Sequence, residues 1–143
     1  MPQLSLQQQI ALRKALKNEL VNIEGIARRA VLKKNLVVDF ASGKPALSSM
    51  QLTALQQAVR SLHSDTKTML SELERQKTVS EAAHENLKAF LSKYDISLEA
   101  FLQNDADALH QIQAWISGQG TFPAKLMPII KRSLLQLSSE LAL

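Results

Sequence analysis

A heptad repeat through residues 52–94 constrains the fold of this chain more than any other feature. Its thirteen positions follow one another at alternating steps of three and four residues, and ten of them are apolar or aromatic. This spacing places the side chains in one stripe along an α-helix, so that the helix packs against other helices over its length. The repeat therefore predicts an all-α protein, a helical bundle of about five helices with one long heptad-patterned helix over 48–94.

Four residues mark the start of this long helix. Ser48 and Gln51 have the spacing of a capping box, in which each side chain satisfies a free backbone N–H of the first turn. Leu47 and Leu52 stand at the two positions of a hydrophobic staple. Together they predict that the helix begins at Ser48.

The heptad stripe weakens where polar Gln76 and Ser80 replace apolar residues. Between them, Thr78 begins a second match to the capping-box spacing. Two interpretations therefore stay open: one continuous helix, or two helices over 48–77 and 79–94 that meet near residue 78. Because no glycine or proline lies at this junction, a continuous or mildly bent helix is favoured over a sharp hairpin.

Three further helical segments complete the predicted single domain of residues 1–143. A basic helix over 6–40 begins with a cap at Ser5, and helices over 98–117 and 122–142 follow the heptad helix. Asn104 or Asp105 is a possible interruption and new cap within the first of these two, and Pro128 is expected to kink or delay the second. The chain contains only four glycines and four prolines, whereas a β-sandwich or barrel needs many turns. The scarcity of turn residues agrees with a helical bundle.

The formal net charge of +4 is distributed unevenly along the chain. Residues 1–60 hold nine basic and three acidic groups, and residues 61–143 hold eight basic and ten acidic groups. Such asymmetry points to an anionic partner; the alternatives are a solvated helix surface or a basic helix that docks on acidic groups of the same fold. The candidate phosphate-contacting side chains are Arg13, Lys14, Lys17, Arg28, Arg29, Lys33, Lys34 and Lys44.

Aromatic residues do not accompany these cations. Phe40 is the single aromatic residue among the first 60. Stacking of bases on aromatic side chains is therefore not the expected mode of binding. If nucleic acid is the partner, we expect salt-sensitive contacts with the phosphate backbone of DNA or RNA.

The residue types needed for catalysis or metal binding do not gather in this sequence. The chain has no cysteine, which excludes thiolate metal sites and cysteine nucleophiles. His63, His84 and His110 lie too far apart in sequence for a helical zinc motif, and there is no glycine-rich phosphate loop. We therefore expect no enzyme activity, no catalytic residue, no cofactor and no metal site.

The heptad stripe itself is a candidate partner interface. A continuous apolar stripe of this length is typical of helices that associate. Trp115, the single tryptophan, is a candidate anchor because tryptophan is enriched among binding hot spots; the alternative is core packing at the end of the bundle. The candidate interface residues are Leu52, Leu55, Val59, Leu62, Met69, Leu73, Leu87, Phe90, Tyr94 and Trp115.

Two functions fit these patterns. One is a non-enzymatic accessory subunit of a nucleoprotein complex that contacts the phosphate backbone through the basic first third of the chain. The other is a purely protein–protein interaction module, such as an adaptor, a secretion chaperone or an assembly scaffold, that acts through the heptad helix. A protein partner or self-association is expected, and no membrane partner or small-molecule substrate. Because no apolar run reaches the ~18 residues of a membrane span and no secretory signal pattern is present, we expect a cytoplasmic protein.

Overall fold

The computed structural model describes residues 5–75 and 81–141, and within these two ranges the chain forms helices and loops without a strand. The predicted all-α class is confirmed. The described residues form eight α-helices and one short 3-10 helix, whereas the sequence predicts about five helices. Their bounds are α1 (Leu6–Leu16), α2 (Ile23–Ala30), α3 (Lys34–Ala41), α4 (Ser49–Arg75), α5 (Glu81–Lys93), α6 (Leu98–Phe101), α7 (Ala106–Ile116), η1 (Ala124–Leu126) and α8 (Met127–Glu140).

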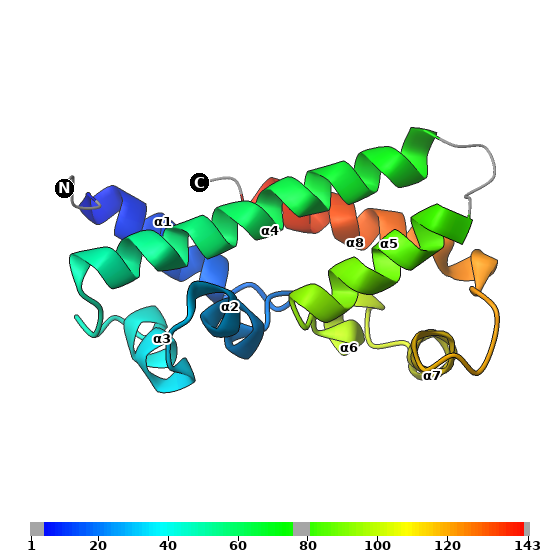
Figure 1. Cartoon of the computed structure of the whole chain (residues 1–143), viewed down its shortest axis with the longest axis horizontal. Coiled ribbons are helices and arrows are strands. Elements are labelled where there is room, and N and C mark those ends of the chain that lie inside the picture. Colours follow the sequence, from blue (N-terminus) through cyan, green and yellow to red (C-terminus); the bar gives the residue numbers. More distant parts are fainter. Residues whose placement is uncertain (1–4, 76–80, 142–143) are drawn as a thin grey trace.

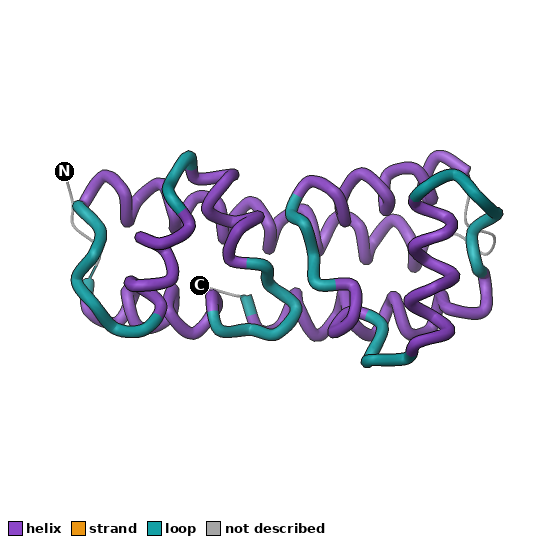
Figure 2. Tube along the Cα trace, turned by 90° about the horizontal axis from the view of Figure 1, so that it is seen from below, coloured by secondary structure: helices purple, strands orange, loops and turns teal. Residues whose placement is uncertain are grey.

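The longest helix, α4, runs along the molecule and organises the others (Figure 1). Helices α1–α3 gather near its first half, α5–α7 lie near its second half, and α8 packs beside it. Figure 2 shows these two groups of short helices at opposite ends of an elongated molecule. No helix in the described ranges is both long enough and apolar enough to span a membrane.

Two of the helix starts follow the predicted capping boxes. At α1, the Ser5 Oγ accepts from the Gln8 backbone N–H at 3.1 Å, and the Gln8 side chain accepts from Ser5 N–H at 2.8 Å. At α4, Ser48 and Gln51 make the same pair of bonds, at 3.2 and 2.9 Å. These short-range bonds satisfy backbone donors that a helix end leaves free.

The prediction of one basic helix over 6–40 is wrong, because this segment contains α1, α2 and α3. Asn18 interrupts the first helix: its Oδ1 accepts from Leu20 N–H at 2.9 Å. Asn22 then caps α2 by accepting from Glu24 N–H at 2.9 Å. Asparagine side chains compete with helical backbone bonds in this way. Val31, with a φ of 58°, ends α2 in the left-handed conformation.

The favoured interpretation of 48–94 as one continuous helix is also wrong. Lys93 Nζ lies 2.9 Å from a carboxylate oxygen of Asp65, 28 positions earlier in the chain. In a continuous helix these residues would be about 42 Å apart, at 1.5 Å per residue. Helices α4 and α5 instead pack against each other. The predicted junction near Thr78 lies outside the described residues.

The two predicted C-terminal helices are divided and delayed where the sequence indicates an interruption at Asn104 or Asp105 and a delay at Pro128. In 98–117, Gln103 and Asn104 have φ values of 58° and 61°, which separate α6 from α7. The Asp105 side chain then caps α7 through the N–H groups of residues 107 and 108. In 122–142, the α-helix begins only at Met127, because Pro128 is accommodated in its first turn.

Candidate functional site

The ten side chains predicted to face a partner are buried inside this chain, each at most 9% exposed. Helices α2, α5 and α8 all pack against α4 and cover the apolar face that the heptad repeat creates. Thr66, a polar residue in the stripe, donates to the Leu62 carbonyl of its own helix at 2.6 Å. The stripe is therefore core in this fold, and the side chains so corrected are Leu52, Leu55, Val59, Leu62, Met69, Leu73, Leu87, Phe90, Tyr94 and Trp115.

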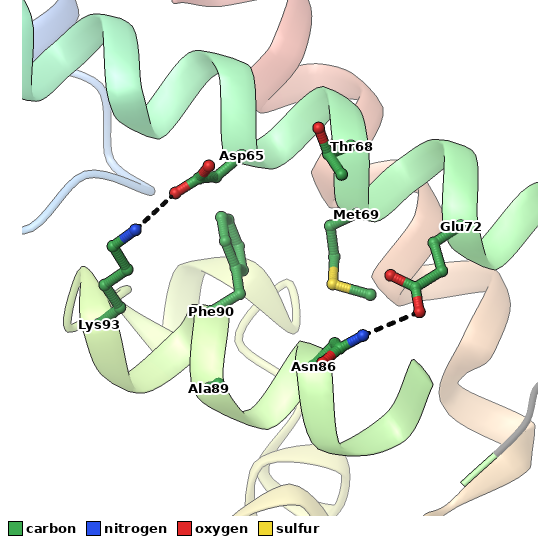
Figure 3. A pocket seen from close by; sticks show the side chains of 8 residues that line it. All are labelled: Asp65, Thr68, Met69, Glu72, Asn86, Ala89, Phe90 and Lys93. Carbon is green, nitrogen blue, oxygen red and sulfur yellow. Dashed lines mark hydrogen bonds and ion pairs between the residues drawn. The ribbon is translucent and has the colours of Figure 1, made fainter. Parts of the chain in front are cut away.

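A shallow groove lies between α4 and α5 (Figure 3). It has a volume of about 260 Å³, and two polar pairs cross it: Asp65 with Lys93 at 2.9 Å, and Glu72 with Asn86 at 3.0 Å. Tyr94 also donates its hydroxyl hydrogen bond to Asp65. These groups satisfy one another, so the groove joins the two helices.

Electrostatics support this structural role for Asp65. Burial alone would raise the pKa of its carboxyl group. Hydrogen bonds from Tyr94 and Lys93, and the positive charges of Lys93 and Arg29, together hold this pKa below its ordinary value. Burial, and then the bond to Asp65, raise the pKa of Tyr94 well above the usual value for tyrosine. The carboxylate therefore stays ionised and the phenol stays protonated at neutral pH, which makes neither a general base near pH 7.

Trp115 belongs to an aromatic cluster that the sequence did not reveal. The Phe122 ring stacks on His84 with centroids 4.2 Å apart and meets the edge of Trp115 at 5.0 Å. Lys88 Nζ lies 5.7 Å from the Trp115 ring centroid. Phe122 lies in the loop after α7 and His84 lies in α5. Because the two residues belong to different elements, no helical spacing in the sequence predicts their contact. No group of three His, Cys, Asp or Glu side chains suited to a metal occurs in the described ranges.

Three of the eight predicted phosphate-contacting residues make a hydrogen bond or an ion pair with another residue of this chain. Arg13 Nε donates to the Phe40 carbonyl at 2.8 Å, and its guanidinium lies 4.4 Å from the centre of the Phe40 ring. Arg28 pairs with Asp95 at 3.3 Å, and Lys44 pairs with Asp39 at 3.8 Å. Arg13 thus joins α1 to α3 as a structural residue, whereas the other two remain exposed with weak surface pairs.

The remaining five cations, Lys14, Lys17, Arg29, Lys33 and Lys34, are exposed and make no ion pair with a carboxylate in the parts of the chain that the structure describes. Arg29 lies 5.9 Å from the Tyr94 ring centroid. Lys14 lies in the last turn of α1, and Lys17 is the C-cap residue of that helix. The predicted basic surface is therefore retained in part, without its Arg13 member.

The densest part of this surface is the connection between α2 and α3. Four cations lie within seven residues, 28–34, around a turn of three residues, 31–33. Val31 projects from this turn with 89% of its surface exposed. We define this group, Arg28, Arg29, Lys33 and Lys34, as the basic turn, and it is the candidate functional site. The chain matches no protein-family model, and no curated protein or solved structure shows significant similarity to it.

Proposed function

We propose that this protein is a non-enzymatic helical subunit that binds the phosphate backbone of nucleic acid through the basic turn between α2 and α3. The observation that supports this most strongly is the clustering of four exposed cations in residues 28–34. Arg28 pairs with Asp95 and the charge of Arg29 acts on the Asp65 carboxylate, whereas Lys33 and Lys34 make no ion pair in the described chain. Like charges this close in the sequence repel one another, and a polyanion relieves that repulsion.

Helix geometry adds to this support. Arg28 and Arg29 stand in the last turn of α2, and Lys33 and Lys34 stand at the start of α3. The two helix ends hold the four side chains around one short turn, whereas a flexible basic tail would lose more entropy on binding. Aromatic platforms are not part of this surface, since Phe40 and Tyr94 are buried. Binding is therefore expected to depend on phosphate contacts.

Salt dependence tests the proposal. We expect a labelled 30-base-pair duplex to bind at ~50 mM salt, with an affinity that falls steeply toward ~200 mM salt. The double variant Lys33→Gln/Lys34→Gln removes two phosphate contacts, so the slope of log K against log salt should decrease by about 1 to 2. Fluorescence anisotropy measures both quantities.

A matched control comes from η1 and α8, neither of which contains or adjoins the basic turn in sequence. Lys125→Gln/Arg132→Gln removes two positive charges from these elements, and η1 lies at the opposite end of the molecule from α2 and α3 (Figure 1). This control should leave the slope close to that of the unmodified protein. Equal effects of the two double variants, or no binding at ~50 mM salt, would contradict the proposal.

A protein-interaction role is the second candidate function, and one observation favours it. The outer face of α1 exposes Leu6 and Ile10, at 69% and 55%, beside Lys14 and Lys17 at helical spacing. Because the heptad stripe is core, such a role would use α1. Sedimentation velocity at rising protein concentration tests for self-association through this face: the unmodified chain should associate, and Leu6→Gln/Ile10→Gln should remain monomeric.

A further inference from the structure

The turn that joins α2 and α3 is short and is closed by backbone hydrogen bonds. Two helices of eight residues each are connected by residues 31–33. Leu32 N–H donates to the Ala27 carbonyl at 2.8 Å and Val31 N–H donates to the Arg28 carbonyl at 3.2 Å, the pair of bonds that defines a Schellman motif. A helix pair joined by three or four residues is also the arrangement of DNA-binding helix-turn-helix units.

The inner faces of both helices are held by packing. Ile26 and Ala27 of α2 are buried, as are Val37 and Phe40 of α3. Helix α4 packs on α2, and Arg13 of α1 fixes the end of α3 through the Phe40 carbonyl. The inner faces of both helices are thus packed against the rest of the fold. Helix α3 lies at the outer end of the molecule (Figure 1).

The outer face of α3 is open and carries groups suited to base edges. Lys34, Asn35 and Val38 are exposed, and their positions place them on one side of the helix. Within the described chain, neither the Asn35 amide nor the Lys34 ammonium has a hydrogen-bond partner. In the major groove, asparagine pairs with adenine, lysine with guanine, and an apolar side chain contacts the thymine methyl group.

We infer that α2, the turn and α3 form a helix-turn-helix unit that inserts the first residues of α3 into the major groove of duplex DNA. This inference rests on the proposed function and specifies the substrate of the basic turn. In such units the first residues of the second helix contact base edges. The basic turn supplies cations next to those residues, complementary to the phosphates that border the groove.

Duplex DNA fits this surface better than RNA or single strands. The major groove of DNA, about 12 Å wide, admits an α-helix, whereas the major groove of an RNA duplex is too narrow and deep for side chains to contact the bases. Single-strand binding uses stacked aromatic side chains, which α3 does not expose. The unit should therefore distinguish duplex DNA from an RNA duplex of the same sequence.

Selection from a randomised DNA pool tests the inference. The full chain is incubated with 30-base-pair duplexes that contain a randomised central segment, and bound duplexes are amplified and sequenced. We expect an enriched motif, and we expect Asn35→Ala to lose the preference at one base pair by about 5- to 150-fold, the range of one bidentate contact. The motif duplex should bind more tightly than the same sequence as duplex RNA.

A control variant and the salt dependence of binding separate the possible results. Gln113→Ala removes an exposed amide from α7 and should leave the motif unchanged. If binding is salt-dependent but no motif is enriched, or if duplex RNA binds equally well, the helix-turn-helix inference is overturned and the proposed function stands. A motif that survives both Asn35→Ala and Val38→Ala also overturns it. If no nucleic acid binds at ~50 mM salt, both the helix-turn-helix inference and the proposed function are overturned.

Discussion

Gly25 lies where α2 meets the end of α5, and its missing side chain allows the close approach. A Cβ atom at this position would be 2.1 Å from the Tyr94 carbonyl oxygen and 2.8 Å from the Tyr94 carbonyl carbon. Neighbouring contacts surround this crossing: Arg28 and Asn22 both reach the Asp95 carboxylate, each at 3.3 Å. One residue without a side chain thus connects the first group of helices to the second.

Gly25→Ala should lower the free energy of unfolding by about 1–3 kcal/mol or more, because backbone atoms must move to admit the methyl group. The intrinsic preference of a helix for alanine, up to ~1 kcal/mol, acts in the opposite direction. Urea unfolding measures the difference. Gly120→Ala is the control, since its Cβ would meet nothing within 4 Å; similar stability losses for the two variants would contradict the close approach.

The local signals that start helices are predictable from this sequence, and the pairing between helices is not. The capping boxes at Ser5 and Ser48 depend on residues three positions apart, so the sequence reveals them. The heptad spacing of apolar residues in 48–94 fits one continuous helix as well as two helices that share a core, so it does not distinguish these arrangements. Only contacts across long separations, such as Asp65 with Lys93, distinguish the two arrangements.

The candidate site shows the same division. The excess of cations in the first third of the chain was visible, but its grouping around one turn depends on where α2 ends. Valine is β-branched, and such residues rarely adopt a positive φ, so a turn at Val31 is not predictable from its residue type. The assignment of Arg13 to a phosphate surface failed for a related reason, because the contact with Phe40 joins residues 27 positions apart.

The pairing of α4 with α5 should depend on pH through Asp65. Its pKa in the folded protein is below the ordinary value of 3.8, so its contribution to stability is present above that pH and is lost as the pH falls through the folded-state pKa. Asp65→Asn should lower the free energy of unfolding by about 1–2 kcal/mol at pH 7. We expect the lower end of this range, because the carboxylate is partly exposed and solvent screens its charge. Urea unfolding at pH 7 and at a series of pH values below 3.8 should show that this difference shrinks as the Asp65 carboxylate becomes protonated in the folded protein.

Glu74→Gln on the same helix provides the matched control. Glu74 is exposed and forms no ion pair in the described residues, so its substitution should have little effect at any of these pH values. A stability loss in Asp65→Asn that stays constant as the pH is lowered through the acid range would show that the ionised carboxylate does not stabilise the helix pair.

Helix α4 runs along both groups of helices, which also meet directly where α2 crosses the end of α5. It packs on α1 and α2 at one end and on α5 at the other, and α8 lies along it. His63 near its middle lies 2.9 Å from the Ser138 carbonyl of α8. The core is one continuous cluster of buried side chains that includes residues from both groups. Such continuity favours a single cooperative unfolding transition, as in most domains of this size.

Leu62→Ala tests whether the two groups unfold together. Leu62 is fully buried in the middle of α4, and its truncation should cost about 2–5 kcal/mol. Far-UV circular dichroism follows all helices, whereas fluorescence follows Trp115 in the second group. Both transitions should shift to lower urea concentration by the same amount and remain superimposed. If the urea midpoint of the Trp115 fluorescence transition is unchanged while that of the circular dichroism transition shifts, the two groups are separate cooperative units. In that case α4 does not couple the stability of the basic turn to that of the second group.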